Sequence, residues 1–151
     1  MKIRRFEEKD AKKVSELIVE TLRKTNIKDY SADLIENYVN NFHPENVLKR
    51  ASWTHFYVAE EKDNIIGCGA IAPYWDESSL FTIFISPEHQ GKGIGRKIIE
   101  TLEKDEYFLR AKRIEIPASI TAVPFYKKMG YSCKNGVNKA DNEGIVRMEK
   151  F

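Results

Sequence analysis

The sequence predicts an α/β (α+β) fold built on a mixed, mostly antiparallel sheet flanked by about four helices. Residues 80–85 are apolar and rich in β-branched and aromatic side chains, which is typical of a buried strand. The hydrophobic period then changes from two to about 3.6, and residues 94–102 carry an apolar stripe typical of a helix. A further strand-like run at residues 113–116 predicts a parallel partner for the first strand, reached through that crossover helix.

The N-terminal part predicts one strand followed by helices. Lys2–Phe6 alternates as a strand does, and Asp10 is a candidate N-cap for an amphipathic helix. A second helix is expected over Ser31–His43, because the residue before Pro44 disfavours helical dihedral angles. A short helical piece is expected at residues 46–50.

The middle of the chain predicts a hairpin. Thr54–Glu60 and Ile65–Ala72 are both rich in strand-forming residues and are separated by a short polar turn. Pro73 is expected to end the second of these strands, because proline has no N–H to donate to a sheet.

The C-terminal part predicts a short helix and a final hairpin. Thr121–Met129 has helical spacing, and Gly130 follows it at the position where helices commonly end in glycine. Tyr131–Lys134 and Gly144–Lys150 are expected to be strands joined by a long polar loop. The predicted order is therefore β-α-α-β-β-β-α-β-α-β-β.

The residues with chemistry lie between the buried strand and the helix, in Gln90-Gly91-Lys92-Gly93-Ile94-Gly95. Glycines at alternate positions let a ligand approach the backbone closely, because no Cβ is in the way. The free N–H groups at the start of the helix favour an anion such as a pyrophosphate. The spacing matches neither a Walker loop nor the G-x-G-x-x-G dinucleotide loop. The alternative is a glycine-rich turn that holds no ligand.

The run Gln90-x-x-Gly93-x-Gly95, after a strand that ends in Ile85-Ser86-Pro87, resembles the acetyl-coenzyme A loop of the Gcn5-related N-acetyltransferase (GNAT) superfamily. The segment at residues 124–131, Pro-Phe-Tyr-Lys-Lys-Met-Gly-Tyr, is similar to a second family motif. The predicted order of elements matches the family over nearly the whole chain. The resemblance implies a GNAT-like twisted sheet with a splayed parallel strand pair, and acetyl-CoA as cosubstrate.

The resemblance also implies where coenzyme A binds. Its pantetheine arm would enter between the splayed strands and its pyrophosphate would lie on the loop. Ser119 stands where many family members carry an asparagine ahead of the helix. The implied coenzyme-binding residues are Ile83, Phe84, Ile85, Gln90, Gly91, Lys92, Gly93, Ile94, Gly95, Arg96, Ser119, Phe125, Tyr126 and Lys128.

Two residues are candidates for catalysis. The resemblance places Tyr126 near the coenzyme sulfur, where its hydroxyl would donate a proton to the leaving thiolate. The helical pattern alone favours a core tyrosine. The basic glutamate of the histone-acetylating subgroup falls at Ser79 here, and Glu77 lies two residues earlier on the same face of an extended strand. Glu77 is the candidate general base, against a solvated turn carboxylate or deprotonation through water.

The composition is that of a soluble globular protein, with 42% hydrophobic and 32% charged residues. At 151 residues, the chain has the length of one domain, and we expect a single domain over residues 1–151. We expect the protein in the cytoplasm, because no apolar run approaches the length of a membrane span. Cys68 and Cys133 have no neighbours of a metal site or a CxxC motif, and the three histidines are scattered. No metal is expected.

The charge is unevenly distributed although the net charge is only +2. Residues 51–89 carry six acidic side chains and one lysine, whereas residues 90–151 carry thirteen basic and eight acidic side chains. The basic half suits a phosphate-rich coenzyme, and the acidic middle suits a cationic amine. The basic residues are dispersed and lack interleaved aromatics, so no nucleic acid is expected.

The expected function is acetyl-CoA-dependent transfer of an acetyl group to a primary amine of a small molecule or protein, and a homodimer is compatible with the sequence. The alternative is a non-catalytic acyl-CoA-binding module, in which Tyr126 is merely packed. The resemblance implies an acceptor pocket built from the N-terminal helices and the hairpin, with the aromatic residues Tyr30, Tyr38, Phe42, Trp53, His55, Tyr74 and Trp75.

Overall fold

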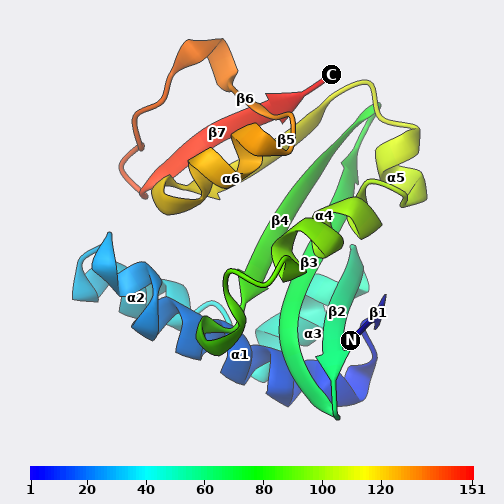
Figure 1. Ribbon diagram of the computed structural model, residues 1–151, viewed down its shortest axis with the longest axis vertical. Coiled ribbons are helices and arrows are strands. Elements are labelled where there is room, and N and C mark those ends of the chain that lie inside the picture. The colour runs from blue at the N-terminus through cyan, green and yellow to red at the C-terminus, as the bar shows by residue number, and fades with distance from the viewer.

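The computed structural model describes residues 1–151 and shows one seven-stranded sheet in the order β1-β2-β3-β4-β5-β7-β6 (Figure 1). The strands are β1 (Lys2–Arg5), β2 (His55–Glu61), β3 (Asn64–Tyr74), β4 (Glu77–Ile85), β5 (Ile114–Ser119), β6 (Ser132–Cys133) and β7 (Ile145–Lys150). The α-helices are α1 (Ala11–Lys24), α2 (Ala32–Val39), α3 (Pro44–Ser52), α4 (Ile94–Leu102), α5 (Glu106–Leu109) and α6 (Val123–Lys128). None of these helices combines the length and the apolar character needed to span a bilayer.

The sheet has one parallel pair. β4 and β5 are parallel, and all other neighbouring strands are antiparallel. The parallel pairing extends over only Ser78–Ile114 and Ser79–Glu115, after which the two strands diverge (Figure 1). The mixed, mostly antiparallel sheet with a splayed parallel pair confirms the fold expected from the sequence.

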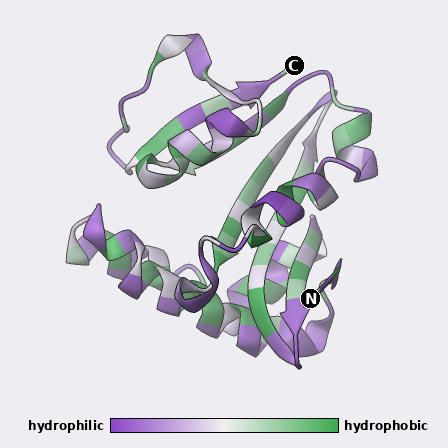
Figure 2. Ribbon diagram, in the orientation of Figure 1, coloured by the Kyte–Doolittle hydropathy of each residue, from purple (hydrophilic) through white to green (hydrophobic).

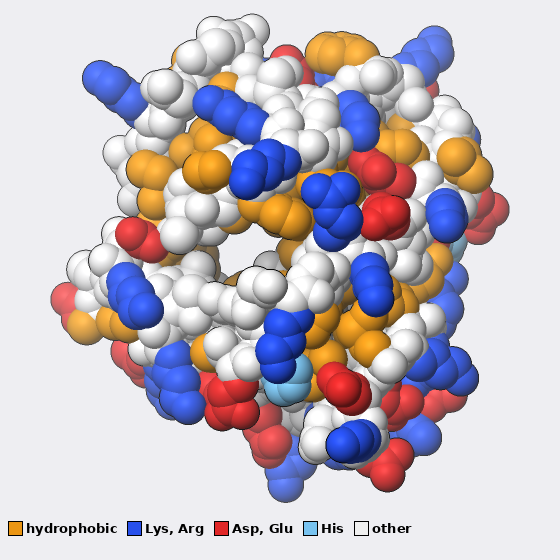
Figure 3. All heavy atoms as spheres, in the orientation of Figure 1, with side chains coloured by type: hydrophobic (Ala, Val, Ile, Leu, Met, Phe, Trp, Pro, Cys, Tyr) orange, Lys and Arg blue, Asp and Glu red, His pale blue; other side chains and the backbone are white.

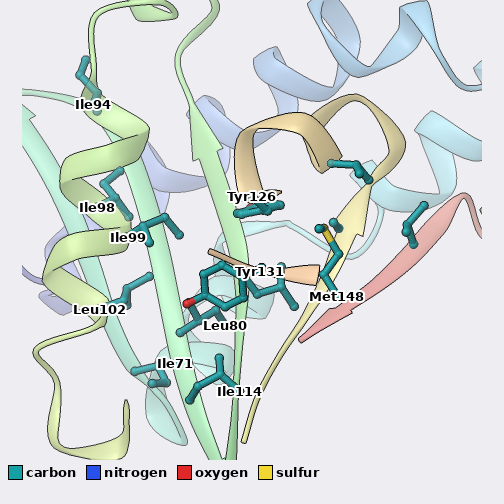
Figure 4. Close-up of a cluster of buried hydrophobic side chains, with 14 of the residues drawn as sticks. Ile71, Leu80, Ile94, Ile98, Ile99, Leu102, Ile114, Tyr126, Tyr131 and Met148 are labelled. Atoms are coloured by element: carbon teal, nitrogen blue, oxygen red, sulfur yellow. The ribbon is translucent and has the colours of Figure 1, made fainter. Parts of the chain in front are cut away.

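Two hydrophobic cores lie on opposite faces of the sheet. One packs α1, α2 and α3 against β2 and β3, through side chains such as Ile18, Ile35 and Phe56. The other packs α4 and α6 against β3, β4, β5 and β7 and joins the two halves of the sheet (Figure 4). Figure 2 shows the apolar residues concentrated along the central strands, whereas the outer faces of the helices are largely hydrophilic.

Helix α4 lies unusually close to β3 because of two glycines. A Cβ on Gly67 would lie 2.9 Å from the Cδ1 atom of Ile98, and one on Gly69 would lie 2.8 Å from its Cγ2 atom. A larger residue in either position would force the Ile98 side chain of α4 to shift. The close packing fixes the start of α4, and hence the loop at residues 90–95, relative to β4.

Several element boundaries differ from those expected. β3 continues through Pro73, which is tolerated because β2 ends where His55 pairs with Ile71, so that Pro73 has no neighbour on that side. The second helix ends at Val39 rather than at His43. The four-residue helix α5 was not predicted, because so short a segment shows no periodicity, and the chain has six α-helices rather than about four.

Helix α2 begins after Ser31, whose hydroxyl caps it by accepting from the N–H of Leu34 at 3.2 Å. Helix α1 begins after Asp10 as expected, but the carboxylate of Asp10 caps no N–H of α1. It accepts instead from the guanidinium of Arg4 at 2.8 Å and from the N–H of Glu7 at 2.8 Å, because Asp10 has helical dihedral angles (φ −82°, ψ −10°) rather than the extended ones of an N-cap residue.

Candidate functional site

A cavity of about 1660 Å³ lies where β4 and β5 diverge. Residues from α1, α2, α3, β4, the loop at 90–95, β5, α6 and β7 line it. Figure 3 shows an opening between α2 and the α6–β7 part of the molecule. The cavity therefore reaches from the start of α4 to the side chains of the N-terminal helices.

The backbone of β4 forms one wall of the cavity. β3 pairs with β4 as far as Gly67–Ile85, but β5 leaves β4 after Ser79. The edge of β4 that faces β5 therefore has no strand partner over residues 80–85. Such an edge presents free N–H and C=O groups, to which a ligand containing amides can hydrogen-bond as an added strand would.

A bulge interrupts this wall. The register with β3 shifts between Cys68 and Ala70, and Thr82 has a φ of +56°. A positive φ is rare for a β-branched residue, and bulges redirect side chains next to active sites. The Thr82 hydroxyl accepts a hydrogen bond from Nη1 of Arg50 at 3.1 Å, which links β4 to α3.

The glycine loop leads into α4 at the C-terminal end of β4. Gly91 and Gly93 have φ values of +77° and +80°, and a Cβ at either would meet no atom within 4 Å. These glycines are therefore required by backbone conformation and leave open space beside the backbone. Gly93 is the residue before the first turn of α4, whose N–H groups have no partner within the helix.

The surroundings of the loop hold it in place. The Gln90 side chain donates to the carbonyl of Ile85 at 3.2 Å and to the hydroxyl of Thr25 at 3.3 Å. A Cβ on Gly95 would lie 3.3 Å from the ring of Phe125, so the small residue lets α4 and α6 approach. The loop is thus tied to β4, α1 and α6.

The structure brings the predicted coenzyme-binding residues together. All of them except Lys92 line the cavity. Lys92 is exposed and does not line it. The cavity-lining members are Ile83, Phe84, Ile85, Gln90, Gly91, Gly93, Ile94, Gly95, Arg96, Ser119, Phe125, Tyr126 and Lys128.

Tyr126 lines the same cavity from α6. Its side chain is only 5% exposed and packs edge-on against Phe125 and Tyr131, with ring centroids 5.3 and 6.3 Å away. Its hydroxyl makes no hydrogen bond within the protein and is not sealed from solvent. Burial raises the pKa of Tyr126, so the hydroxyl carries its proton at neutral pH.

Glu77 also lines the cavity, at the end where β4 and β5 still pair. One of its carboxylate oxygens accepts from Nη1 of Arg113 at 3.2 Å, and its side chain is 44% exposed. Arg113 also contacts Glu115 and Glu149, each at 2.8 Å, and the hydrogen bond to Glu115 raises its pKa. Arg113 is therefore fully neutralised, while the second oxygen of Glu77 has no protein partner.

The implied acceptor residues fall into two groups. His55 lies outside the cavity, where its ring stacks on Tyr107 with centroids 3.8 Å apart and its Nδ1 atom lies 2.9 Å from Asp105. Of the six acidic residues in segment 51–89, only Glu77 lines the cavity. The remaining implied aromatic residues do line it, namely Tyr30, Tyr38, Phe42, Trp53, Tyr74 and Trp75.

Sequence reasoning missed Arg50 and Thr82, which both line the cavity. Arg50 reads as an ordinary solvated residue on the polar face of a short helix, and Thr82 as an ordinary strand residue. Their contact joins residues 32 positions apart in the chain. No local pattern could have predicted it.

Comparisons with known proteins agree with this geometry. Residues 26–151 match the model of the acetyltransferase (GNAT) domain. A comparison with curated protein sequences gives no significant match.

Solved structures with the same fold include PaiA N-acetyltransferase from Thermoplasma acidophilum in complex with coenzyme A, with a TM-score of 0.85 and 20% identity over 99% of this chain and 97% of that one. Ribosomal-protein-alanine N-acetyltransferase from Brucella melitensis has a TM-score of 0.69 and 15% identity over 100% and 99%. Aminoglycoside 6′-acetyltransferase type Ii has a TM-score of 0.73 and 20% identity over 99% and 96%. The family model, matched over most of the chain, shows that this protein belongs to the GNAT acetyltransferase family.

Proposed function

We propose that the chain is an acetyl-CoA-dependent N-acetyltransferase that moves an acetyl group directly to a primary amine, with residues 1–151 as one catalytic domain. The observation that carries the proposal is one cavity that joins the unpaired edge of β4, the glycine loop at the start of α4 and the hydroxyl of Tyr126. Membership of the GNAT family and the coenzyme A complex of the Thermoplasma structure support it.

The residues of the cavity fit the chemistry of coenzyme A. The open backbone at Gly91 and Gly93 and the first turn of α4 suit a pyrophosphate. Arg96 and Lys128 line the cavity nearby and make no ion pair with any carboxylate of the chain, so they suit further phosphate oxygens. The unpaired edge of β4 at residues 83–85 suits the amides of the pantetheine arm.

Two residues have proposed roles in the transfer. Acetyl-CoA supplies the acetyl group as an activated thioester. Tyr126 donates its hydroxyl proton to the sulfur as the thiolate leaves, which its raised pKa permits because the hydroxyl stays protonated. Glu77 accepts the proton of the amine. Glu77 lines the cavity, and its second carboxylate oxygen, which has no protein partner, is free to take that proton.

A pair of glycine variants tests the coenzyme site. Gly93→Ala adds a Cβ to the open space of the loop, and Gly136→Ala adds one at a similar φ of +72°, also with nothing within 4 Å, but away from the cavity. Both should lose about 1 kcal/mol of stability from backbone strain. Only Gly93→Ala should also weaken coenzyme A binding, measured by calorimetry. Equal binding by the two variants would remove the loop from the coenzyme site.

Turnover is tested by following free-thiol release from acetyl-CoA with a panel of primary amines. Coenzyme A that binds only the folded protein should also raise its melting temperature. The proposal expects both effects. Binding without thiol release for any amine would favour the non-catalytic acyl-CoA-binding module.

A further inference from the structure

Arg50 is a cation on the cavity wall that no carboxylate of the chain neutralises. It lies on α3, and no Asp or Glu oxygen is within 4.0 Å of its guanidinium. Its only side-chain hydrogen bond is the one from Nη1 to the hydroxyl of Thr82. The guanidinium carbon lies 4.8 Å from the ring centre of Phe42 and 5.8 Å from that of Phe81, so two aromatic rings hold the group in position.

Partial burial of the Arg50 guanidinium without a counter-charge costs free energy, and a bound anion would offset that cost. Partial burial without a counter-charge lowers the pKa of Arg50, whereas the hydrogen bonds of Arg113, in the same cavity, raise its pKa. A guanidinium has five N–H donors, and the protein uses one of those of Arg50. None of its nitrogens is sealed away from solvent without a partner. The remaining donors are therefore open to solvent, and Arg50 lines the cavity.

The position of Arg50 separates it from the coenzyme phosphates. Its partner Thr82 lies three residues before Ile85, about 10 Å along β4 from the end where the glycine loop begins. Arg96 and Lys128 are the unpaired cations at that other end. Arg50 instead lies on the side of the N-terminal helices, where Trp53 stacks on Phe81 with centroids 5.6 Å apart. This part of the cavity is cationic and aromatic.

We propose that Arg50 binds a carboxylate of the acceptor, so that the preferred acceptors are small amines that bear a carboxylate, such as amino acids. A planar guanidinium held by two rings and one hydroxyl is pre-organised to donate two parallel hydrogen bonds to a carboxylate. The inference rests on the proposed function and names its substrate class. It replaces the cationic acceptor expected from sequence, because the acidic residues behind that expectation lie outside the cavity, except for Glu77, which Arg113 already pairs.

The test compares matched acceptors and matched variants. Glycine, methionine and phenylalanine are each assayed beside their amides, with kcat/KM corrected for the fraction of free amine. Arg50→Met keeps the apolar stem against Phe42 and Phe81 and removes the charge, and Arg50→Lys keeps the charge without the bidentate geometry. Lys12→Met, on the exposed face of α1 outside the cavity, removes an equal charge. Unchanged coenzyme A binding by calorimetry shows that each variant is folded.

The wild type and Lys12→Met should prefer the acids, and Arg50→Met should lower kcat/KM for the acids by roughly 10- to 100-fold while leaving the amides nearly unchanged. Arg50→Lys should have a kcat/KM for the acids between those of the wild type and Arg50→Met. A wild-type preference for the amides, or an equal loss for acids and amides in Arg50→Met, would overturn the proposal.

A binding measurement keeps the outcome independent of turnover. N-acetylphenylalanine should bind the coenzyme A-loaded protein at least about tenfold more tightly than N-acetylphenylalaninamide, and Arg50→Met should abolish the difference. If no amine is acetylated but this difference is present, the proposed function fails and the carboxylate site stands. If the two ligands bind equally to the wild type, the carboxylate site is wrong whatever the enzyme activity.

Discussion

At the scale of single residues, two neighbouring tyrosines show how surroundings decide a role. Tyr126 and Tyr131 are both buried, and burial raises the pKa of both. The hydroxyl of Tyr131 donates to Glu103 at 2.9 Å, outside the cavity, whereas that of Tyr126 has no protein partner and reaches the cavity. Of these two tyrosines, Tyr126 is the one whose hydroxyl no protein group already binds.

Tyr126→Phe should therefore slow turnover on the order of 10²-fold, because one positioned proton donor is lost. Coenzyme A affinity should stay the same, since the ring still packs against Phe125 and Tyr131. Tyr131→Phe is the matched control, and should cost about 1 kcal/mol of stability with no change in turnover. Steady-state kinetics with calorimetric binding checks both. Equal turnover in Tyr126→Phe and the wild type would leave Tyr126 a packing residue.

Glu77→Gln tests the general base. A lost base should lower the rate most near neutral pH, and raising the pH should restore it because the amine then loses its proton to solvent. Glu115→Gln removes another carboxylate that pairs with Arg113, without removing the proposed base. A pH–rate profile that recovers at high pH in Glu77→Gln alone supports the role. Parallel profiles in the two variants would assign Glu77 to the ion pair only.

At the scale of elements, a bridge of hydrogen bonds links the two sides of the cavity. The hydroxyl of Tyr30, which precedes α2, donates to the carbonyl of Gly144 at 2.6 Å and accepts from the N–H of Ile120 at 3.1 Å. On α2, the hydroxyl of Tyr38 donates to the carbonyl of Glu143. These contacts join the N-terminal helices to the strands beyond the splay, so β4 and β5 can part without the two halves separating.

Gly144→Ala should break this bridge. Gly144 has a φ of +79°, and an added Cβ would lie 2.4 Å from Cε1 of Tyr30. Backbone strain costs about 1 kcal/mol, and loss of the tyrosine hydrogen bonds adds about 1 to 2 kcal/mol. Gly136→Ala, with a similar φ of +72° in open space, should show the strain alone. Chemical denaturation measures both, and equal losses of stability would mean that Tyr30 moves aside freely.

At the scale of the whole molecule, the folded protein holds several tyrosines in their neutral form. Burial raises the pKa of Tyr57 to about 12, with help from the hydrogen bond that its hydroxyl donates to Asp105 at 2.6 Å. The pKa values of four more tyrosines are also raised, with burial as the largest cause, namely those of Tyr30, Tyr38, Tyr126 and Tyr131. Ionisation of these side chains therefore opposes folding.

The expected consequence is a loss of stability at alkaline pH. Because the pKa of Tyr57 is higher in the folded than in the unfolded chain, its contribution is complete below about pH 10 and declines as the pH rises towards 12. Denaturant midpoints should fall steeply between pH 10 and about 12. Tyr57→Phe should be less stable at pH 8 but should lose less between pH 10 and about 12. An identical pH dependence in the variant would contradict this assignment.

The sequence by itself determined the elements that depend on residues close together in the chain. Periodicity and β-branched residues predict β4 and α4, and the glycines at 91, 93 and 95 predict the anion-binding loop between them. These features depend on side chains within a few positions of each other. The resemblance of these residues to a known family then gave the topology and the set of predicted coenzyme residues, all of which except Lys92 line the cavity.

Only the tertiary structure decided which distant residues meet. The parallel pairing of β4 with β5 ends after two residue pairs, and the cavity lies beyond that point. Thr82, at the bulge in β4, accepts a hydrogen bond from Arg50 of α3. The hydroxyl of Tyr30 donates to the carbonyl of Gly144, which lies 114 positions away in the chain. The acidic segment that favoured a cationic acceptor places one carboxylate in the cavity, that of Glu77, which pairs with Arg113. Charge along a chain is a local property, whereas the charge that a substrate meets depends on how side chains pair after folding.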